Sequence, residues 1–390
     1  MGNKICVLHV VGTRPIGGIG SLLKNINKVI DLESFAFIYA FSSSELTGDF
    51  DKQVEKYNSS VVVFPSYKIR NIFRYLKQIK HFYKTNASHI DILHVHSPNT
   101  GVLDLYYAKK YGITIRILHS HSTKYSGKKI NAIRNYILQL PVKKLATHYF
   151  ACSLKAAEFL FGKNNIGNTS IIHNAIFPNS FLFSEKVRNR YRFDLGIADT
   201  NFVIGHVGNF TEEKNHFFLL DVFREVYTQN CKAILLLIGS GTLENQIRHR
   251  IKELELEKAV LMLGRRADVH NWLQAMDVFV FPSFFEGLPL TLIEAQTAGL
   301  HCIVSSNITT ETNITNYIEY LSLESSSKIW AESILKYSNG YNRENMEEQI
   351  SKAGYDIRTE VTMLEKLYFD SLNNRIYSRH RCYICKFRHV

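Results

Sequence analysis

Two glutamates separated by seven residues form the most informative pattern in this sequence. Glu286 and Glu294 lie in the segment Phe281-Pro-Ser-Phe-Phe-Glu-Gly-Leu-Pro-Leu-Thr-Leu-Ile-Glu-Ala295. A carboxylate can accept hydrogen bonds from two hydroxyl groups, so a pair of acids is suited to hold a sugar or a ribose. The spacing alone is equally compatible with an exposed loop acid followed by an ordinary helix acid.

The residues around the two glutamates predict a strand, a tight loop and a helix. Asp277–Phe281 is a short apolar run rich in β-branched and aromatic residues, which favours a buried parallel strand. Pro282, Gly287 and Pro289 interrupt regular structure, and from Pro289 the apolar spacing becomes helical. Such a turn directs free N–H groups and the positive end of a helix dipole towards one edge of a sheet. An anion is expected to bind there.

Glu286-Gly-Leu-Pro, together with Glu294, resembles the E-x7-E signature of retaining glycosyltransferases of family 4. The resemblance implies an α/β chain with the GT-B fold, in which two Rossmann-like domains face each other across a cleft. It also implies that the first glutamate and the following amides hold the sugar and phosphate of a nucleotide-diphosphate sugar such as a UDP-sugar, while the second glutamate holds the ribose. The donor-binding residues implied in this segment are Glu286, Gly287, Leu288, Leu290 and Glu294.

A glycine-rich turn, residues 12–20, follows a predicted strand at residues 4–11 and precedes a predicted helix at residues 21–30. This arrangement can accept a phosphate, and it is also typical of a plain tight turn. In family 4, Gly17 and Gly18 match the double glycine that lies against the donor diphosphate. Gly12-Thr-Arg-Pro15 is also similar to the start of the non-hydrolysing UDP-N-acetylglucosamine 2-epimerases, which have an acidic residue where this chain has Ile16 and lack the Glu286 signature.

Four further donor contacts are implied by the resemblance. The segment Asn209–Asn215 matches the family's G-R-x4-K-N loop, in which Lys214 corresponds to the lysine that neutralises the diphosphate. Asn209 stands where arginine is usual, which removes one charge and bears on donor affinity and donor type. Gly239 lies in the turn after a predicted strand, and Arg266 lies in a turn that passes near the base in the family.

Paired histidines end two predicted strands, at His94 and His96 and at His119 and His121. We expect these strand ends to expose the histidines to a crevice, where the rings would hydrogen-bond a sugar or phosphate. In the family, a histidine lies over the donor sugar, and His121 matches that position best, with His119 as second choice. His96 and His119 are the possible residues on the acceptor side. No metal is expected, because no cysteine or carboxylate accompanies the rings. The residues expected to carry the chemistry are His121, Glu286 and Lys214.

Length and composition agree with two globular α/β domains in 390 residues, of which 45% are hydrophobic. No long apolar window and no signal-peptide pattern is found, which favours a cytoplasmic protein with reduced cysteines. The net charge of +12 favours an acidic partner, and the absence of a nucleic-acid-binding motif argues against DNA or RNA.

Basic segments suggest contact with an anionic membrane surface. Residues 68–84 predict an amphipathic helix with an apolar stripe (Ile69, Ile72, Phe73, Leu76, Ile79 and Tyr83) and a basic face. Residues 124–144 are also basic, which favours a pyrophosphate-bearing acceptor. The tail from residue 376 to 390 carries Cys382 and Cys385, a weak case for zinc. A solvated basic face explains each segment equally simply.

The predicted organisation is an acceptor-binding domain at residues 1–180, a linker at 181–199 and a nucleotide-sugar-binding domain at 200–355. A helix at 356–375 then returns to the first domain. The resemblance is strongest to enzymes of capsular or exopolysaccharide assembly and implies a retaining hexosyltransferase at the inner face of the plasma membrane. Its acceptor would be a lipid-linked glycan or an oligosaccharide, and it would need no cofactor. The alternatives are a UDP-N-acetylglucosamine 2-epimerase and a non-catalytic sugar-nucleotide-binding subunit.

Overall fold

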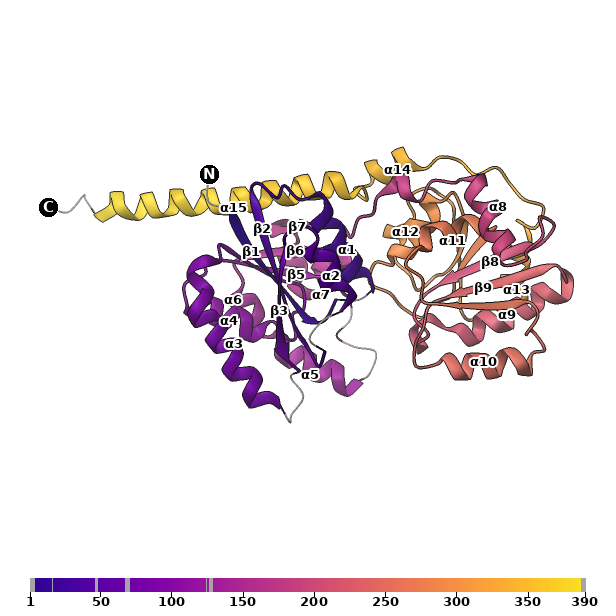
Figure 1. Cartoon of the computed structure of the whole chain (residues 1–390), viewed down its shortest axis with the longest axis horizontal. Coiled ribbons are helices and arrows are strands. Elements are labelled where there is room, and N and C mark those ends of the chain that lie inside the picture. Colours follow the sequence, from indigo (N-terminus) through magenta and orange to yellow (C-terminus); the bar gives the residue numbers. More distant parts are fainter. Residues whose placement is uncertain are drawn as a thin grey trace. The chain divides into compact units, whose positions relative to one another are not determined.

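A computed structural model describes residues 4–15, 17–45, 48–66, 71–123, 125 and 129–386, without the side chains of residues 129–131 and 374–386. The chain forms two compact units. The first unit contains Met1–Ala175 and Ile357–Val390, and the second contains Ile176–Asp356 (Figure 1). None of the helices in the described ranges has both the length and the apolar character needed to cross a membrane.

The first unit is built on a parallel sheet that has, in the described residues, seven strands in the order β3-β2-β1-β4-β5-β6-β7. The strands are β1 (Ile5–Thr13), β2 (Phe35–Ser43), β3 (Ser60–Pro65), β4 (Ile92–Val95), β5 (Ile115–Ser120), β6 (His148–Ala151) and β7 (Thr169–Ile171). The helices are α1 (Gly17–Val29), α2 (Asp49–Glu55), α3 (Ile72–Asn86), α4 (Val102–Lys110), α5 (Lys129–Gln139), α6 (Val142–Leu145), α7 (Leu154–Phe161) and α15 (Ile357–Lys386). The strand order reverses direction between β1 and β4, which is where open α/β sheets bind ligands.

The last helix of the chain completes the first unit. Tyr368 of α15 is fully buried, and its hydroxyl group lies 2.7 Å from Nδ1 of His94 in β4. The Tyr368 ring also lies against the ring of Phe35 in β2, with 5.8 Å between centroids. Helix α15 therefore covers the face of the sheet that carries Phe35 and His94 (Figure 1).

The second unit is also built on a parallel sheet, which within the described residues has six strands in the order β10-β9-β8-β11-β12-β13. The strands are β8 (Phe202–Val207), β9 (Ala233–Ile238), β10 (Val260–Gly264), β11 (Val278–Phe281), β12 (His301–Ser305) and β13 (Ile318–Leu321). The helices are α8 (Glu185–Asp194), α9 (His216–Gln229), α10 (Glu244–Glu253), α11 (Val269–Ala275), α12 (Leu290–Thr297), α13 (Ser327–Leu335) and α14 (Glu347–Lys352). Here the strand order reverses between β8 and β11.

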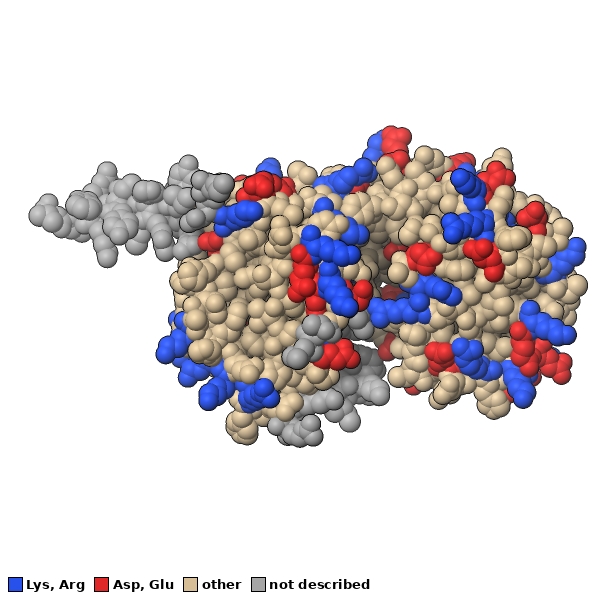
Figure 2. All heavy atoms as spheres, viewed as in Figure 1, with Lys and Arg blue, Asp and Glu red and all other residues tan. Residues whose placement is uncertain are grey.

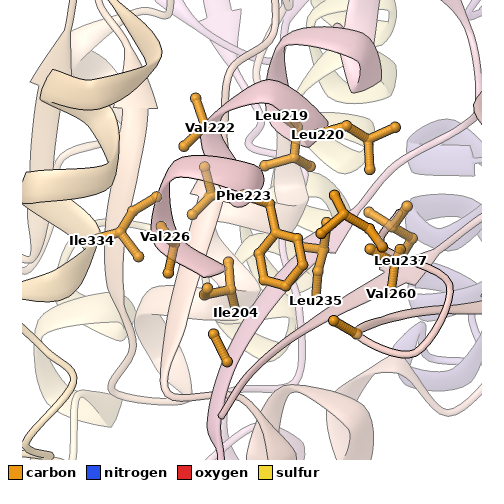
Figure 3. Close-up of a cluster of buried hydrophobic side chains, with 14 of the residues drawn as sticks. Ile204, Leu219, Leu220, Val222, Phe223, Val226, Leu235, Leu237, Val260 and Ile334 are labelled. Carbon is orange, nitrogen blue, oxygen red and sulfur yellow. The ribbon is translucent and has the colours of Figure 1, made fainter. Parts of the chain in front are cut away.

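The second unit has a hydrophobic core on each face of its sheet. On one face, Phe223 of α9 packs among β-strand residues such as Ile204, Leu235 and Leu237 (Figure 3). On the other face, Trp272 of α11 belongs to a core that includes strand and α12 side chains. The apolar strand runs that the sequence contains are thus buried on both sides, as parallel sheets require.

The structure differs from the sequence prediction in the region expected to be a linker. Residues 181–199 contain helix α8, which packs on α11. Arg188 and Arg192 of α8 each place a guanidinium nitrogen 2.6 Å from a carboxylate oxygen of Asp277. The charge of this segment favoured a linker in the sequence analysis, but Arg188 and Arg192 use their charge to attach helix α8 to the rest of the second unit.

Other predicted elements also need correction. Ile318–Leu321 pairs with β12 as strand β13, which the sequence analysis did not predict. Phe73, assigned to the apolar stripe of the basic helix, is 85% exposed, whereas Tyr75 is buried. Residues 67–70 at the predicted start of that helix lie outside the described residues.

Several other expectations concern side chains that the structure does not describe. The basic side chains of Lys124, Lys128 and Lys129 lie outside the described side chains. The tail was expected to leave the helix after residue 375, but α15 continues to Lys386. Side chains are not described in that part of α15, so the prediction for Cys382 and Cys385 is not addressed.

Candidate functional site

The reversal of strand order in the second unit brings two loops to the same edge of the sheet. The loop after β8 contains Lys214, and the loop after β11 contains Glu286. The backbone N–H of Phe284 donates to the carbonyl oxygen of Glu213 at 2.9 Å, which ties the two loops together. The side-chain amide of Asn215 donates to the carbonyl oxygen of Pro282 at 3.2 Å and adds a second tie. Both loops follow buried strands, so they are held by the core.

Lys214 and Glu286 form an ion pair at this edge. The Lys214 Nζ lies 2.7 Å from Oε1 of Glu286 and 4.7 Å from the centroid of the Phe281 ring. The two side chains are 16% and 17% exposed, so the pair is largely shielded from water but not closed off. An ammonium group held in this way can bind an anion on its open side while the carboxylate fixes its position.

Gly208 and Gly239 allow the turns after β8 and β9 to lie against each other. Gly239 has a φ of +151°, and a Cβ atom there would lie 1.9 Å from the carbonyl oxygen of Gly208. A Cβ on Gly208 would in turn lie 3.1 Å from Cδ of Lys214. Gly239, predicted as a donor contact, therefore has a clear structural role in placing the Lys214 loop.

The helix that follows the Glu286 loop carries the second glutamate. Glu294 lies in α12 and is partly buried, and this burial raises the pKa of its carboxyl group to about 7. Leu288 and Leu290 are 8% exposed and anchor the loop to the core, while Gly287 between the loop acid and the helix is half-buried. Near neutral pH, Glu294 can thus act as a hydrogen-bond donor as well as an acceptor.

The two remaining predicted donor contacts of the second unit lie on the surface. Asn209 is exposed, and its carbonyl oxygen accepts a hydrogen bond from the N–H of Thr211 at 2.9 Å. Arg266 is exposed, and its guanidinium carbon lies 5.4 Å from the centroid of the Trp272 ring. Both side chains are available to a ligand.

Sequence reasoning missed two histidines beside Lys214. His206 in β8 pairs its Nδ1 with the carbonyl oxygen of Val280 at 2.8 Å, and His216 begins helix α9. Both are buried, and burial together with nearby Lys214 lowers their pKa values, to about 4 for His216. In the sequence, His206 lies two residues before Gly208 and His216 directly follows Asn215. Their positions beside the Lys214 loop could have identified them as candidate site residues.

The first unit presents its glycine turn at the start of helix α1. Gly17 has a φ of +62°, a conformation that strongly favours glycine, and α1 begins at this residue. Gly17 and Gly18 are both exposed. The free N–H groups at the start of this helix therefore face solvent beside the reversal point between β1 and β4.

Five histidines of the first unit form one cluster on and just after neighbouring strands: His9 on β1, His94 on β4 with His96 directly after the strand, and His119 on β5 with His121 directly after it. Ring nitrogens pair across the strands: His9 with His96 at 3.0 Å, His96 with His121 at 2.9 Å and His94 with His119 at 3.1 Å. The structure thus brings all four predicted histidines together and adds His9, which the sequence analysis missed. The apolar neighbours of His9 made it look like part of an ordinary buried strand.

The burial of these histidines corrects the expectation that strand ends expose them. His94, His96 and His119 are 1–2% exposed, and only His121 is partly accessible. Burial lowers the pKa of His9 to about 3 and that of His121 to about 4, so the rings are neutral at neutral pH. His96 and His119 are therefore interior residues, and His121 is the member that a ligand could reach.

The neutral imidazole is the form of histidine that binds metals. The positions of these rings show whether they could hold a metal ion. Within the described residues, two sets of three histidines place one ring nitrogen each within 4.8 Å of the others: His9, His94 and His96, and His96, His119 and His121. The rings lie nearly parallel, with interplanar angles of 16–36°. Because nitrogen lone pairs lie in the ring plane, stacked rings do not converge on one point. This arrangement suits a hydrogen-bonded stack better than a metal centre.

Residues 187–357 match the family model described as glycosyl transferases group 1. This range covers most of the second unit, including the loops that carry Lys214 and Glu286.

Known proteins resemble the chain over most of its length. It is 28% identical to the putative glycosyltransferase EpsF of Bacillus subtilis (strain 168) over 370 residues, which cover 93% of this chain and 96% of EpsF. It is 26% identical over 315 residues to the UDP-Gal:alpha-D-GlcNAc-diphosphoundecaprenol alpha-1,3-galactosyltransferase of Escherichia coli, covering 78% of this chain and 80% of that enzyme. Further relatives are named as glycosyltransferases of capsular polysaccharide or O-antigen biosynthesis.

Among solved structures, the chain is similar to HepE of Anabaena in complex with UDP-glucose. The TM-score is 0.72 at 17% sequence identity, and the match covers 95% of this chain and 100% of HepE. At this level of identity, the likeness concerns the fold.

Proposed function

We propose that this chain is a member of the glycosyl transferases group 1 family that transfers a hexose from a nucleotide-diphosphate sugar to a lipid-linked glycan with retention of anomeric configuration. It has the GT-B fold of two Rossmann-like domains, as predicted, and is a glycosyltransferase of polysaccharide biosynthesis. The Lys214–Glu286 ion pair at the reversal point of the second sheet is the observation that carries the proposal.

In this proposal, the second unit binds the donor. Lys214 would bind the diphosphate on the side of its ammonium group that faces away from Glu286, and the N–H groups at the start of α12 would bind further oxygens. Glu286 would accept hydrogen bonds from sugar hydroxyls, and Glu294 would hold the ribose. The UDP-glucose bound by HepE and the UDP-Gal named for the Escherichia coli relative support a UDP-sugar as donor.

The proposed reaction is a front-face attack by the acceptor hydroxyl as the donor diphosphate leaves. The negative charge that develops on the diphosphate would be stabilised by Lys214 and by the amides that follow Glu286. Glu286 orients the sugar and is not the nucleophile, because its charge is engaged by Lys214 at 2.7 Å. Lys214 supplies positive charge to the leaving group, so the proposed chemistry needs no metal.

An apolar helix face of the first unit supports an acceptor at a membrane. Helix α5 has an inverted pattern, in which Asn135 and Gln139 are buried while large apolar side chains are exposed. The exposed side chains near and along this helix are those of Ile133, Tyr136, Ile137, Leu138 and Leu140. An exposed apolar face of this kind fits the apolar region of a bilayer or a lipid tail.

Basic residues of the first unit add an electrostatic contribution. Helix α3 exposes Arg74, Lys77, Lys80 and Lys84, together with Phe73. Figure 2 shows lysine and arginine side chains gathered over the part of this unit where α3 lies. Each such residue close to an anionic membrane surface contributes about 1 kcal/mol of attraction. We propose peripheral binding to the inner face of the plasma membrane, in agreement with the diphosphoundecaprenol acceptor named for the Escherichia coli relative.

The function is tested by incubating the purified chain with UDP-glucose, UDP-galactose or UDP-N-acetylglucosamine, with and without a polyprenyl-diphosphate-linked sugar. We expect an α-linked product from one donor, only when the acceptor is present, and unchanged by EDTA. Conversion of UDP-N-acetylglucosamine without acceptor would instead identify an epimerase. If Glu286→Ala and Lys214→Ala left polymer synthesis in cells intact, a non-catalytic sugar-nucleotide-binding role would replace the proposal.

Membrane binding is tested by co-sedimentation with vesicles that contain anionic phospholipid. Ile137→Ser is expected to weaken binding, because it removes an exposed apolar side chain from α5. Phe193→Ser is the matched control, since Phe193 is 83% exposed but lies in α8 of the second unit. An equal loss of binding in both variants would contradict the assignment of α5.

A further inference from the structure

Three of the clustered histidines form a continuous hydrogen-bonded row across adjacent strands. Nδ1 of His9 lies 3.0 Å from Nε2 of His96, and Nδ1 of His96 lies 2.9 Å from Nε2 of His121. The row runs from the interior at His9, which is fully buried, to His121, which is partly accessible at the end of β5. Each ring presents Nδ1 towards the next residue of the row, in the direction of His121.

A neutral imidazole carries one N–H, and each contact between ring nitrogens needs one proton. The three rings must therefore share one orientation. Either every Nδ1 carries the proton and the row ends in an N–H on His121, or every Nε2 carries it and the row ends in an N–H on His9. Burial keeps all three rings neutral, because it lowers their pKa values far below neutrality.

The two ends of the row distinguish these orientations. Nε2 of His9 is buried and has no hydrogen-bond partner in the described part of the chain. At the other end, a hydrogen bond with the side chain of Asn174 raises the pKa of His121. Protons on Nε2 would bury an N–H of His9 without an acceptor, which is rarer in proteins than an unpaired acceptor. Protons on Nδ1 instead place the terminal N–H on His121, beside Asn174, whose buried Oδ1 has no other partner in the described part of the chain and can accept it.

We propose that His96 and His9 are positioning residues that hold His121 in the tautomer with the proton on Nδ1. His121 then donates from Nδ1 towards Oδ1 of Asn174, so that both ring nitrogens are engaged and the ring is held in one orientation. Its Nε2 is occupied by the N–H of His96, so His121 does not act as a general base through that atom. Only the expected effect on activity rests on the proposed function.

A second pair of histidines provides an internal control for the test. His119 pairs with His94 at 3.1 Å, and His94 pairs with the hydroxyl group of Tyr368 at 2.7 Å. This second row stacks on the first but shares no hydrogen bond with His121. Tyr368→Phe removes one buried hydrogen bond from the cluster and leaves the row from His9 to His121 intact.

The tautomer is measured on the full chain labelled with ¹⁵N-histidine, using two-bond ¹H–¹⁵N correlation spectra at neutral pH. The signals of His121 are assigned by their loss in His121→Gln. We expect a protonated Nδ1 and a bare Nε2. A protonated Nε2, or a ring with both nitrogens protonated, would overturn the proposal.

Substitution of His96 tests the role of the row. His96→Asn keeps an N–H donor near the position of Nδ1 and is expected to preserve the tautomer of His121, whereas His96→Leu is expected to give a mixture of both tautomers. His9→Leu is the second variant, in case His96→Leu does not fold, and it is expected to produce the same mixture. Tyr368→Phe is expected to leave the tautomer unchanged, and an equal change in Tyr368→Phe would show a packing effect and overturn the proposal.

Activity provides the second readout. If His121 contacts the reacting substrates, His96→Leu is expected to lower kcat by about ten- to a hundredfold, the loss found when residues that orient a metal-binding histidine are replaced. His96→Asn is expected to keep most of the wild-type kcat. The spectra report the tautomer whether or not the protein transfers a sugar. A failure of the positioning role can thus be told apart from a failure of the proposed function.

Discussion

Replacing Glu286 by glutamine is expected to strengthen the binding of free UDP while it weakens sugar transfer. The carboxylate of Glu286 lies 2.7 Å from Nζ of Lys214 and neutralises it. A diphosphate that binds the same ammonium group is repelled by the carboxylate. Glutamine keeps the size and one acceptor oxygen but removes this repulsion. UDP lacks the sugar whose hydroxyl groups Glu286 is proposed to bind. The substitution therefore strengthens UDP binding without removing a contact to UDP.

The geometry sets the size of the effect. A phosphate oxygen on the far side of Nζ would lie about 5–6 Å from the carboxylate. Two like charges at that distance repel by about 3 kcal/mol at an effective dielectric constant near 20 and by about 0.7 kcal/mol in water. Because Lys214 and Glu286 are 16% and 17% exposed, an intermediate value applies. A gain of about 1–2 kcal/mol corresponds to roughly 5- to 30-fold tighter UDP binding.

Isothermal titration of UDP into the wild-type protein and Glu286→Gln measures this change directly. Glu212→Gln is the matched control, since Glu212 lies two residues before Lys214 and is exposed, so that it changes the net charge equally. The control is expected to change UDP affinity less than about twofold, because exposed charges are strongly screened. UDP binding that is unchanged or weaker in Glu286→Gln would refute the argument that the carboxylate and diphosphate compete for Lys214.

Acid should destabilise the protein, because burial lowers the pKa of His9 to about 3 and that of His121 to about 4. Below about pH 6.5, the unfolded chain binds protons at these rings while the folded chain does not. The free energy of unfolding therefore falls as the pH drops from 6.5 towards 4. Urea titrations at several pH values will measure this decrease. Gly239→Ala should lower the melting temperature strongly, because its Cβ would lie 1.9 Å from a backbone carbonyl oxygen. Asp277→Asn should cost about 3 kcal/mol in denaturant unfolding, since it leaves the buried guanidinium of Arg192 without its carboxylate.

Local patterns were sufficient for the strand, loop and helix around Glu286. The β-branched run before Pro282 and the proline at residue 289 predicted elements that the structure has at Val278–Phe281 and Leu290–Thr297. The fold class is confirmed as well, and the family model of glycosyl transferases group 1 matches residues 187–357, as the resemblance implied. These features depend on short-range hydrophobic spacing and on turn residues, which can be read directly from the chain.

Contacts between distant segments could not be predicted in the same way. The ion pair between Lys214 and Glu286 depends on β8 lying next to β11, and the place of His9 in the histidine row depends on β1 lying next to β4. Helix α8 has little hydrophobic periodicity and is held by Arg188 and Arg192, so its tertiary contacts decide its structure. Strand order is a property of the whole sheet, and one sequence does not contain it in any local pattern.

The position of α15 has a consequence for the order in which the protein is completed during synthesis. The second unit ends at Asp356, whereas the first unit takes buried side chains from Val361, Leu364 and Tyr368. Ribosomes make chains from the N-terminus, and domains generally fold as units as they emerge. The unit that begins the sequence is therefore the last to be finished. Until its final helix leaves the ribosome, the sheet face around Phe35 has no cover and is open to chaperones.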